Sequence, residues 1–194
     1  IGRMVDEFSA FARMPKPDMQ MVDIREGLRE ASFLVEVSRS DIAFRREFGR
    51  EPLMGRFDSR LLAQAFGNII KNASEAIEQS QAEAGRPGEI LVSATRSEDN
   101  VVVEVIDNGK GLPKENRQRL LEPYMTTREK GTGLGLAIVK KIVEDHGGTL
   151  ELLDAPASFH EGVGARVRMI FPLGDKQEAT AQTGPETEKV ADGV

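Results

Sequence analysis

The sequence predicts an α+β fold, a two-layer sandwich in which helices cover one face of a mixed β-sheet. Segments with helical spacing of apolar residues and segments rich in β-branched residues alternate along the chain, in the order helix and strands, long helix, hairpin, loop, helix, hairpin. The chain has 194 residues, which is room for one domain of ordinary size with appendages. We therefore expect one α+β domain flanked by shorter segments.

The composition limits the classes of function open to the chain. Its formal net charge of −6 argues against nucleic acid as the main partner, because phosphate backbones are bound by basic surfaces. The sequence has no cysteine, which excludes a disulfide framework and thiolate metal sites. No run approaches the roughly 20 apolar residues of a membrane span, and we expect a cytoplasmic chain.

The first residues predict a helix that packs against other helices. Apolar residues recur at steps of three and four from Ile1 to Ala12, and Pro15-Lys16-Pro17 cannot continue a helix. Because the chain opens on Ile1 within this pattern, we expect it to be a piece of a longer protein. Residues 1–17 are then the end of a bundle helix with its linker, and the domain covers residues 18–173.

A helix and two strands are expected to open the domain. Asp23-Ile24-Arg25-Glu26 is a capping box, and the helix that it starts runs through the apolar residues Leu34 and Val35. Ile42 to Phe48 and Leu53 to Phe57 alternate or cluster as strands do.

A long helix and a hairpin follow. Asp58 is the expected N-cap of a helix that ends before Gly85. Strands are predicted for Glu89 to Thr95 and for Val101 to Asp107, because both segments are rich in β-branched residues and the polar stretch Ser97-Glu98-Asp99-Asn100 lies between them.

The last third of the chain predicts two helices and a second hairpin. A short helix lies around Glu115 to Leu121, and a longer one runs from Leu134 to His146, before a glycine pair of the kind that ends helices. The final hairpin pairs residues 150–153 with residues 165–171. Residues 174–194 contain almost no bulky apolar side chain and are expected to form a disordered acidic tail.

Two asparagines on the long helix are candidate ligands. Asn68 and Asn72 lie one helical turn apart, so both amides project from the same face, although asparagine is a poor helix former. A side-chain amide oxygen suits Mg²⁺, which usually shares its oxygen ligands with substrate phosphates and water. From this pair alone, a metal-binding role and a solvated polar flank are equally supported.

Two glycine-containing turns are also candidates. Asp107 ends an apolar strand and is followed by Gly109 and Gly111, so its carboxylate could accept a hydrogen bond from an amino group such as that of adenine. Gly131-Thr-Gly-Leu-Gly135 runs directly into a helix, which is a site where backbone N–H groups can meet an anion. Taken singly, each could also be an ordinary turn.

The three motifs occur in one order: Asn68-Ile-Ile-Lys-Asn72-Ala-Ser-Glu-Ala, Asp107-x-Gly109-x-Gly111 and Gly131-Thr-Gly-Leu-Gly135-Leu-Ala-Ile-Val. In that order and spacing they resemble the asparagine box and the two glycine boxes of the ATP-binding domain of sensor histidine kinases. Glu122 to Thr127 resembles the aromatic box of that family, and Gly162-x-Gly164 through Pro172 resembles its closing strand. The resemblance covers about residues 22–172, and the helix and linker before it resemble the nitrogen-regulation subgroup.

The resemblance implies that the domain binds ATP with Mg²⁺. Asn72 would be the Mg²⁺ ligand, Asn68 would support the phosphate side, and Lys71 would contact a phosphate. Asp107 would read the adenine. Gly109 and Gly111 would line the base. The lid over the phosphates would include Thr127, Arg128 and Lys130. The phosphate-binding turn would consist of Gly131, Thr132, Gly133, Leu134, Gly135 and Leu136.

Three reactions stay open on the sequence. The leading hypothesis is transfer of the γ-phosphoryl group to a histidine on a dimerisation helix of the same or the partner subunit, and then to the receiver domain of a response regulator. Asn68 disfavours hydrolysis, because gyrase-like and chaperone ATPases resemble one another in placing a glutamate there to activate water. Glu75 and Ala165 depart from the family pattern, which leaves open a nucleotide-binding module without phosphotransfer.

The two histidines, His146 and His160, lack the setting of a phosphoacceptor, and we interpret both as surface or helix-end residues. The implied acceptor lies on a preceding helix outside these 194 residues. The apolar stripe from Ile1 to Ala12 implies a homodimeric parent protein, and its alternative is packing against the chain's own domain. Anchoring of the parent protein in the inner membrane stays open.

Overall fold

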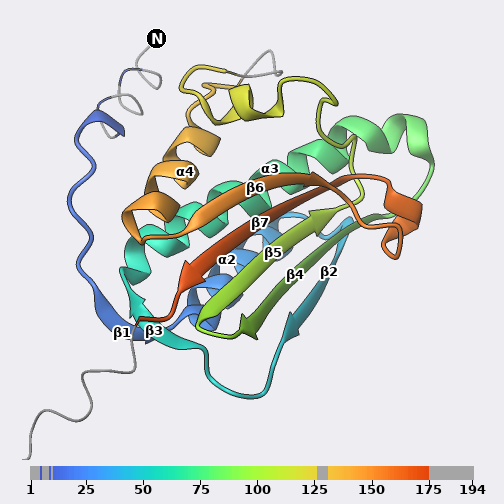
Figure 1. The fold of residues 1–194 in the computed structure, drawn as a ribbon. Coiled ribbons are helices and arrows are strands. Elements are labelled where there is room, and N and C mark those ends of the chain that lie inside the picture. Colours follow the sequence, from blue (N-terminus) through green and yellow to red (C-terminus); the bar gives the residue numbers. More distant parts are fainter. Residues whose placement is uncertain (1–4, 6–8, 10, 126–130, 175–194) are drawn as a thin grey trace, which may run out of the picture.

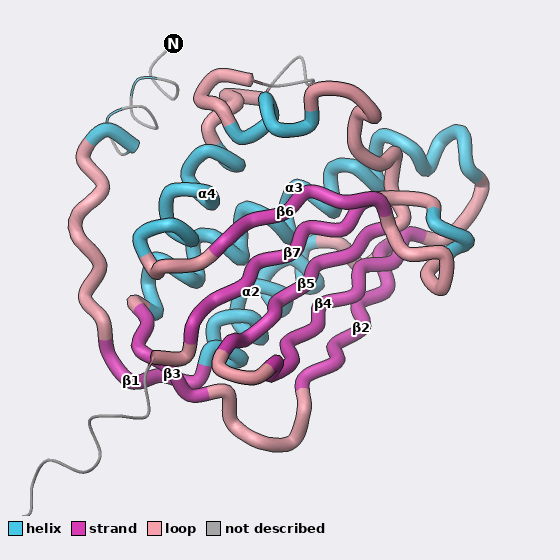
Figure 2. The backbone as a smooth tube through the Cα atoms, viewed as in Figure 1, coloured by secondary structure: helices cyan, strands magenta, loops and turns pink. Residues whose placement is uncertain are grey.

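The computed structural model describes residues 5, 9, 11–125 and 131–174. A five-stranded sheet forms one layer, and three helices cover one of its faces, as Figures 1 and 2 show. The predicted two-layer α+β sandwich is therefore confirmed. The expected disordered tail and most of the expected first helix lie outside the described residues.

The sheet has the strand order β2-β4-β5-β7-β6. The pair β2·β4 is parallel and the other three pairs are antiparallel, so the sheet is mixed as predicted. The parallel pair is possible because the long helix α3 carries the chain from one end of the sheet back to the other. The strands are β2 Ile42–Phe48, β4 Gly88–Ser97, β5 Asn100–Asp107, β6 Thr149–Asp154 and β7 Ala165–Pro172.

The helical layer consists of α2 (Ile24–Ser38), α3 (Ser59–Ala84) and α4 (Gly135–Asp145). Their inner faces and the inner face of the sheet share one apolar core. Phe66 and Phe171 meet edge to face there, with ring centroids 6.5 Å apart. The sheet and the three helices therefore form one packed unit around that core. Two 3₁₀ helices lie in the connections, η1 (Arg117–Leu121) and η2 (His160–Gly162).

The start of α2 confirms the predicted cap and adds partners for it. The Asp23 carboxylate accepts the Arg25 N–H at 3.1 Å and also the Leu53 N–H at 3.1 Å. The Arg25 guanidinium lies 2.6 Å from the same carboxylate, and this pairing lowers the pKa of Asp23 although burial opposes it. One side chain thus caps the helix and fastens the loop before β3.

A second, two-stranded sheet was not predicted. The strand β1 (Gln20–Asp23) pairs antiparallel with β3 (Met54–Phe57) below the main sheet in Figure 1. The four residues of β1 show no apolar alternation, so nothing in their pattern indicates a strand; pairing with β3 is what makes them extended.

The apolar residues of α2 do not all face the core. Leu28 and Ala31 are buried, whereas Leu34 is 64% exposed, which differs from its expected place in the helix's apolar run. Phe33 and Val37 are exposed beside it. The helix contacts the sheet mainly at β2 and β4, near one edge, so part of its circumference has no layer to pack against.

The first turn of α3 and the last turn of α4 meet at Asp58 and His146, which we call the α3–α4 junction. The Asp58 carboxylate accepts the Leu61 N–H at 3.0 Å, which confirms the predicted N-cap. His146 lies at the end of α4 as expected, but it is only 6% exposed, so its interpretation as a surface residue is wrong. Its ring packs edge to face on Phe171.

None of the helices in the described part of the chain combines the length and apolarity needed to cross a bilayer.

Candidate functional site

Asn68 and Asn72 lie on α3 beside its buried stripe. Both are partly exposed, while Ile69, Ile70 and Ala73 between and after them are buried in the core. The two amides therefore sit where the helix leaves the core, on a face that a ligand can reach. Lys71 points away from that stripe: its side chain is 70% exposed and its Nζ lies 4.0 Å from Glu75 Oε1.

Asp107 ends β5 with a buried carboxyl group that is 4% exposed. Burial raises the pKa of Asp107 to about 7, although the N–H groups of Gly109 and Ala165 donate to it and act in the opposite direction. The Gly109 N–H lies 2.9 Å from Asp107 Oδ1. A carboxyl group held in this way is ready to accept a hydrogen bond from an amino group, which is what the adenine-reading role requires.

Asn108 is a residue of this turn whose role the sequence analysis missed. It is 2% exposed, its Oδ1 accepts the Glu89 N–H at 2.8 Å, and its Nδ2 donates to the Pro87 carbonyl at 2.9 Å. These bonds fix the end of β5 to the start of β4. The Asp-Asn-Gly sequence indicated a turn, and only the neighbouring strand reveals what the amide holds.

Gly109 brings the Asp107 turn against α3. A Cβ at Gly109 would lie 2.6 Å from the carbonyl carbon of Ala76, and the next residue, Lys110, donates its N–H to the Ala76 oxygen at 3.3 Å. Ala76 is one turn beyond Asn72 on the same helix face. The structure thus brings the first two predicted motifs together, and the expected base-lining glycine also serves helix packing.

A third segment closes on the same turn. Gly164 has a φ of +115°, and a Cβ there would overlap the Asp107 carbonyl oxygen at 1.7 Å. Gly111, with a φ of +77°, lies against Gly164 in turn. Ala165, the next residue, is paired with Asp107 across the β5·β7 ladder. The turn that contains Gly111 and the turn that contains Gly164 therefore pack against each other beside Asp107.

The third motif forms the start of α4. Leu134 is fully buried and anchors the turn, while a Cβ built on Gly135, the first residue of the helix, would meet no other part of residues 11–125 or 131–174 within 4 Å. Gly133 adopts a φ of +71° with its Cα close to the Tyr124 backbone. Ile138 is the residue whose N–H bonds back to Leu134, so the N–H groups of the first turn before it have no partner within the helix. That end of α4 therefore carries the partial positive charge of a helix N-terminus.

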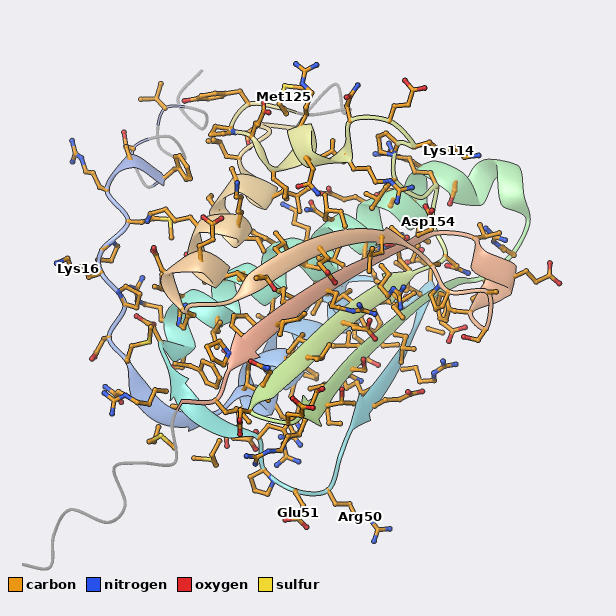
Figure 3. The ribbon with its side chains drawn as sticks, viewed as in Figure 1. Lys16, Arg50, Glu51, Lys114, Met125 and Asp154 are labelled. Carbon is orange, nitrogen blue, oxygen red and sulfur yellow. The ribbon has the colours of Figure 1, made fainter. Side chains whose placement is uncertain are left out.

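The segment between β5 and α4 passes above α3 in Figure 1. Figure 3 labels Lys114 and Met125 along it, at the opposite end of the molecule from Arg50 and Glu51. The expected lid residues Thr127, Arg128 and Lys130 lie outside the described residues. Gly131 and Thr132 follow directly and are partly exposed.

Two hollows in the described surface lie elsewhere. One is beside the linker and includes Lys16 and Arg60, and the other is a groove of about 590 Å³ that includes Phe33 and Phe48 on α2 and β2. Neither contains a predicted site residue. We place the site where the Asp107 turn meets α3, with the start of α4, a helix that shares the core with α3, as its expected phosphate end.

The donor set fits Mg²⁺ only together with a phosphate ligand. Within the described residues there is no group of three or more His, Cys, Asp or Glu side chains able to hold a metal ion. The amide oxygens of Asn68 and Asn72 are the hard donors on the α3 face. One or two such oxygens with substrate phosphates and water are what Mg²⁺ ordinarily takes, so the residues fit the ion as a companion of a nucleotide.

Comparison with known proteins identifies this combination of fold and site. The family model described as "Histidine kinase-, DNA gyrase B-, and HSP90-like ATPase" matches residues 57–175. The chain belongs to that family of nucleotide-binding domains. Within it, this is an ATP-binding catalytic domain of the sensor histidine kinase type, as the sequence motifs predicted.

The relatives support that assignment. The chain is 54% identical over 182 residues to nitrogen regulation protein NtrY of Azorhizobium caulinodans, which covers 93% of this chain and 23% of NtrY. The mycobacterial sensor histidine kinase MprB has a structure with a TM-score of 0.68 and 28% identity, covering 79% of this chain and 97% of that one. Full-length ShkA in complex with AMPPNP has a TM-score of 0.72 and 25% identity, covering 88% and 35%. The chain spans about a quarter of the length of the first curated relatives it matches.

Proposed function

We propose that this domain binds Mg-ATP and transfers the γ-phosphoryl group to a histidine on a dimerisation helix, for onward transfer to an aspartate of a response-regulator receiver domain. The observation that carries the proposal is a buried carboxyl group whose turn packs on the helix that carries the two asparagines, together with the N-terminus of α4, which packs in the same core. The AMPPNP complex of ShkA, a structural neighbour, supports ATP as the nucleotide.

Each group has a role that follows from its chemistry. Asp107 accepts a hydrogen bond from the adenine amine, and Gly109 and Gly111 lie beside the base. The first N–H groups of α4, from Gly133 to Leu136, bind the phosphates. Mg²⁺, held by Asn72 and the phosphates, would neutralise charge on the transferred group.

The remaining candidates act at the phosphate end. Asn68 supports the phosphate side, and Lys71 requires a rotamer other than the one near Glu75 if it is to reach a phosphate. The lid residues Thr127, Arg128 and Lys130 would supply further hydrogen bonds and positive charge there, next to Gly131 and Thr132. Phosphoryl transfer needs mainly such positioning and charge neutralisation, since little covalent chemistry falls to the protein.

The acceptor histidine belongs to a helix other than those described. The imidazole of His146 is buried and hydrogen bonded through both nitrogens. The imidazole of His160 lies 2.7 Å from Glu89 Oε2 in the β6–β7 connection. Neither is presented on the open face of a helix, as an in-line attack on ATP requires. We assign residues 1–17 to the end of the dimerisation helix that follows the acceptor helix, with its linker, residues 18–173 to the catalytic domain and residues 174–194 to a tail.

Two other functions stay as alternatives, each with a feature in its favour. Hydrolysis is favoured by membership in a family that includes ATPases, but Asn68 has no basicity with which to activate water. Binding without transfer is favoured by Glu75 and Ala165. The Ala165 N–H, however, donates to Asp107 as backbone, which any residue at that position can do.

Labelling with γ-labelled ATP separates these functions. The chain is incubated alone and then with a purified helical hairpin that carries the acceptor histidine. We expect stable label on the hairpin histidine only when the chain is present, and loss of label with Asn72→Ala. Lys140→Ala is the matched control, because Lys140 is an exposed residue of α4 near Glu144 and should leave labelling unchanged.

The other outcomes contradict the proposal. Stable label on the chain alone would place the acceptor within these residues. Steady phosphate release without any labelled protein would identify an ATPase, and nucleotide binding without either would identify a binding module.

A further inference from the structure

The imidazole of His146 has a defined tautomer. Its Nε2 lies 3.0 Å from the Asp58 backbone N, and its Nδ1 lies 2.7 Å from the Ile142 carbonyl oxygen. A backbone N–H can only donate, so Nε2 accepts, and Nδ1 must carry the proton that is donated to Ile142. The ring is therefore neutral, and it joins the last turn of α4 to the residue that caps α3.

Asp58 connects three segments at this point. Its N–H donates to His146, while its carboxylate accepts the Leu61 N–H at 3.0 Å and the Asp18 N–H at 2.9 Å. Phe57 and Phe171 pack around the imidazole, with ring centroids 6.2 Å from that of His146 in both cases. The hydrogen bonds from the Asp58 N–H to His146 and from the Leu61 N–H to Asp58 are buried and therefore shielded from water.

The proposed nucleotide site lies part-way along α3, at its asparagines, and at the far end of α4. Asn68 follows Asp58 by ten residues along α3, and Gly135 precedes His146 by eleven along α4. At the rise of an α-helix, both positions are about 16 Å from the junction. Figure 1 shows that α3 and α4 lie close together at the junction and diverge away from it. A tilt of a few degrees between the two helices about the junction would change the distance between Asn68 and Gly135 by about 1 Å.

We propose that His146 is a positioning residue for the nucleotide site: by accepting the Asp58 N–H, it sets the angle between the helix that carries the asparagines and the helix that carries the phosphate-binding turn. This inference rests on the nucleotide-binding function proposed above. It assigns to a histidine far from the reacting atoms an effect on nucleotide affinity, which the sequence analysis did not attribute to it.

Three substitutions separate the two hydrogen bonds of the imidazole. His146→Gln places a side-chain amide oxygen near the position of Nε2 and keeps an acceptor for the Asp58 N–H. His146→Asn is too short for that bond but can still donate to Ile142 within its own helix. His146→Phe keeps a ring between Phe57 and Phe171 and has neither bond. Leu28→Ala, in the core under α2, is the control that loses stability without touching the junction.

The whole chain is titrated with Mg-AMPPNP by calorimetry, and the stability of each variant is measured by urea unfolding. We expect His146→Gln to bind within about twofold of the wild type. We expect His146→Asn and His146→Phe to bind about tenfold more weakly, the effect of one lost buried hydrogen bond. Leu28→Ala should bind as the wild type does despite its lower stability.

A spectroscopic readout tests the geometry directly. In ¹⁵N–¹H spectra of the wild type, the His146 ring should show the Nδ1-protonated neutral tautomer. The amide signals of Gly133 and Gly135 should move in His146→Asn and His146→Phe and stay in place in Leu28→Ala. An Nε2-protonated ring, or weak-binding variants that leave both glycine signals unmoved, would overturn the positioning role.

The failures of the two proposals are distinguishable. A wild-type chain that binds no Mg-AMPPNP contradicts the proposed function itself. A wild type that binds, together with a His146→Phe variant that binds equally well, contradicts the inference about His146 alone.

Discussion

Two buried aspartates respond to pH in opposite directions. Burial acts to raise the pKa of Asp58, but the N–H groups of Asp18 and Leu61 outweigh it and lower the pKa below 3.8. Burial prevails at Asp107 and raises its pKa to about 7. Asp58 therefore stabilises the fold above about pH 4, the unfolded value, and loses that contribution as the pH falls through its folded pKa. Asp107, with its raised pKa, instead lowers the free energy of unfolding as the pH rises from about 4 to about 7.

The first prediction concerns the stability profile of Asp107→Asn. Between about pH 4 and pH 7 the unfolded chain releases the Asp107 proton and the folded chain keeps it, so this group lowers the free energy of unfolding as the pH rises. The asparagine variant lacks that fall, which amounts to a few kcal/mol. Urea unfolding of both proteins at pH 5 and pH 8 measures it.

The control for this prediction is Asp154→Asn, since the Asp154 side chain is 67% exposed. That variant should follow the wild-type profile. An Asp107→Asn protein whose stability changes with pH as much as that of the wild type would contradict the raised pKa.

The residue types at the site were largely readable from the sequence, and their supports were not. Asp107 and the asparagines are identified by chemistry and spacing, which are visible along the chain. Asn108 holds Glu89, which lies 19 residues earlier in the chain, and Gly164 packs on Asp107, which lies 57 residues earlier. No local pattern encodes such contacts, so they appear only when the sheet is assembled.

At the scale of elements, the two glycines at the start of α4 have different roles, one in the fold and one in ligand access. Gly133 and Gly135 are two residues apart, but a Cβ at Gly133 would lie 2.6 Å from the Tyr124 carbonyl carbon at a φ of +71°, while one at Gly135 would meet no other segment of the described chain within 4 Å. The first glycine is required by the chain itself. The second is required only if something approaches the helix N-terminus from outside.

The second prediction follows from that pair. Gly133→Ala should lower the free energy of unfolding by about 1–3 kcal/mol, the range for a residue held in strained backbone. Gly135→Ala should leave stability unchanged or raise it slightly, because alanine favours the helix, and should weaken nucleotide binding through the added methyl group. Urea unfolding and calorimetric titration with Mg-AMPPNP give the two quantities. Equal binding by Gly135→Ala and the wild type would argue against phosphate approach at that residue.

The third prediction concerns the cap of α3. Asp58→Ala removes the acceptor for the Leu61 and Asp18 N–H groups but keeps the backbone N–H that donates to His146. We expect a loss of about 1–2 kcal/mol in the free energy of unfolding at pH 7, typical of a lost N-cap. The loss should shrink as the pH falls below about 4, where the wild-type carboxylate is protonated in turn.

Thermal and urea unfolding at pH 7 and pH 3 test this cap. Glu144→Ala serves as the control, because Glu144 is exposed and its ion pair with Lys140 on α4 is long, at 3.8 Å. A loss at pH 3 as large as that at pH 7 would mean that the Asp58 carboxylate is not the stabilising group.

Most helices and strands were predictable because their signals are local. Caps, apolar periods and turn residues mark α2, α3, α4 and both hairpins within a few residues of their observed bounds. The strand β1 and the exposure of Leu34 were not predictable, since both depend on which neighbour lies alongside. The residues of β1 are extended because they pair with β3, and Leu34 is exposed because it lies at the edge of the helical layer.

At the scale of the whole molecule, the fold gathers its site from segments that are far apart in the chain. The α3 helix, the end of β5 and the turn before β7 converge at the Asp107 turn, and α4, which carries the phosphate-binding turn, packs beside α3 in the same core. Sequence order and spacing indicated the family and hence this convergence. The angle between α3 and α4, and with it the proposed role of the junction, required the packed core.

The position of β5 between β4 and β7 also sets an order of events during synthesis. Asp107 is made about 60 residues before β7, whose pairing completes the ladder on its second side. At roughly 5–20 residues per second, the ribosome leaves that strand edge open for several seconds. Until Ala165 and the residues after it emerge, the nascent domain has a central strand paired on one side only, and the turn around Asp107 is incomplete. A chaperone that protects open strand edges would therefore meet this domain late in its translation, and nucleotide could bind only after the last strand is in place.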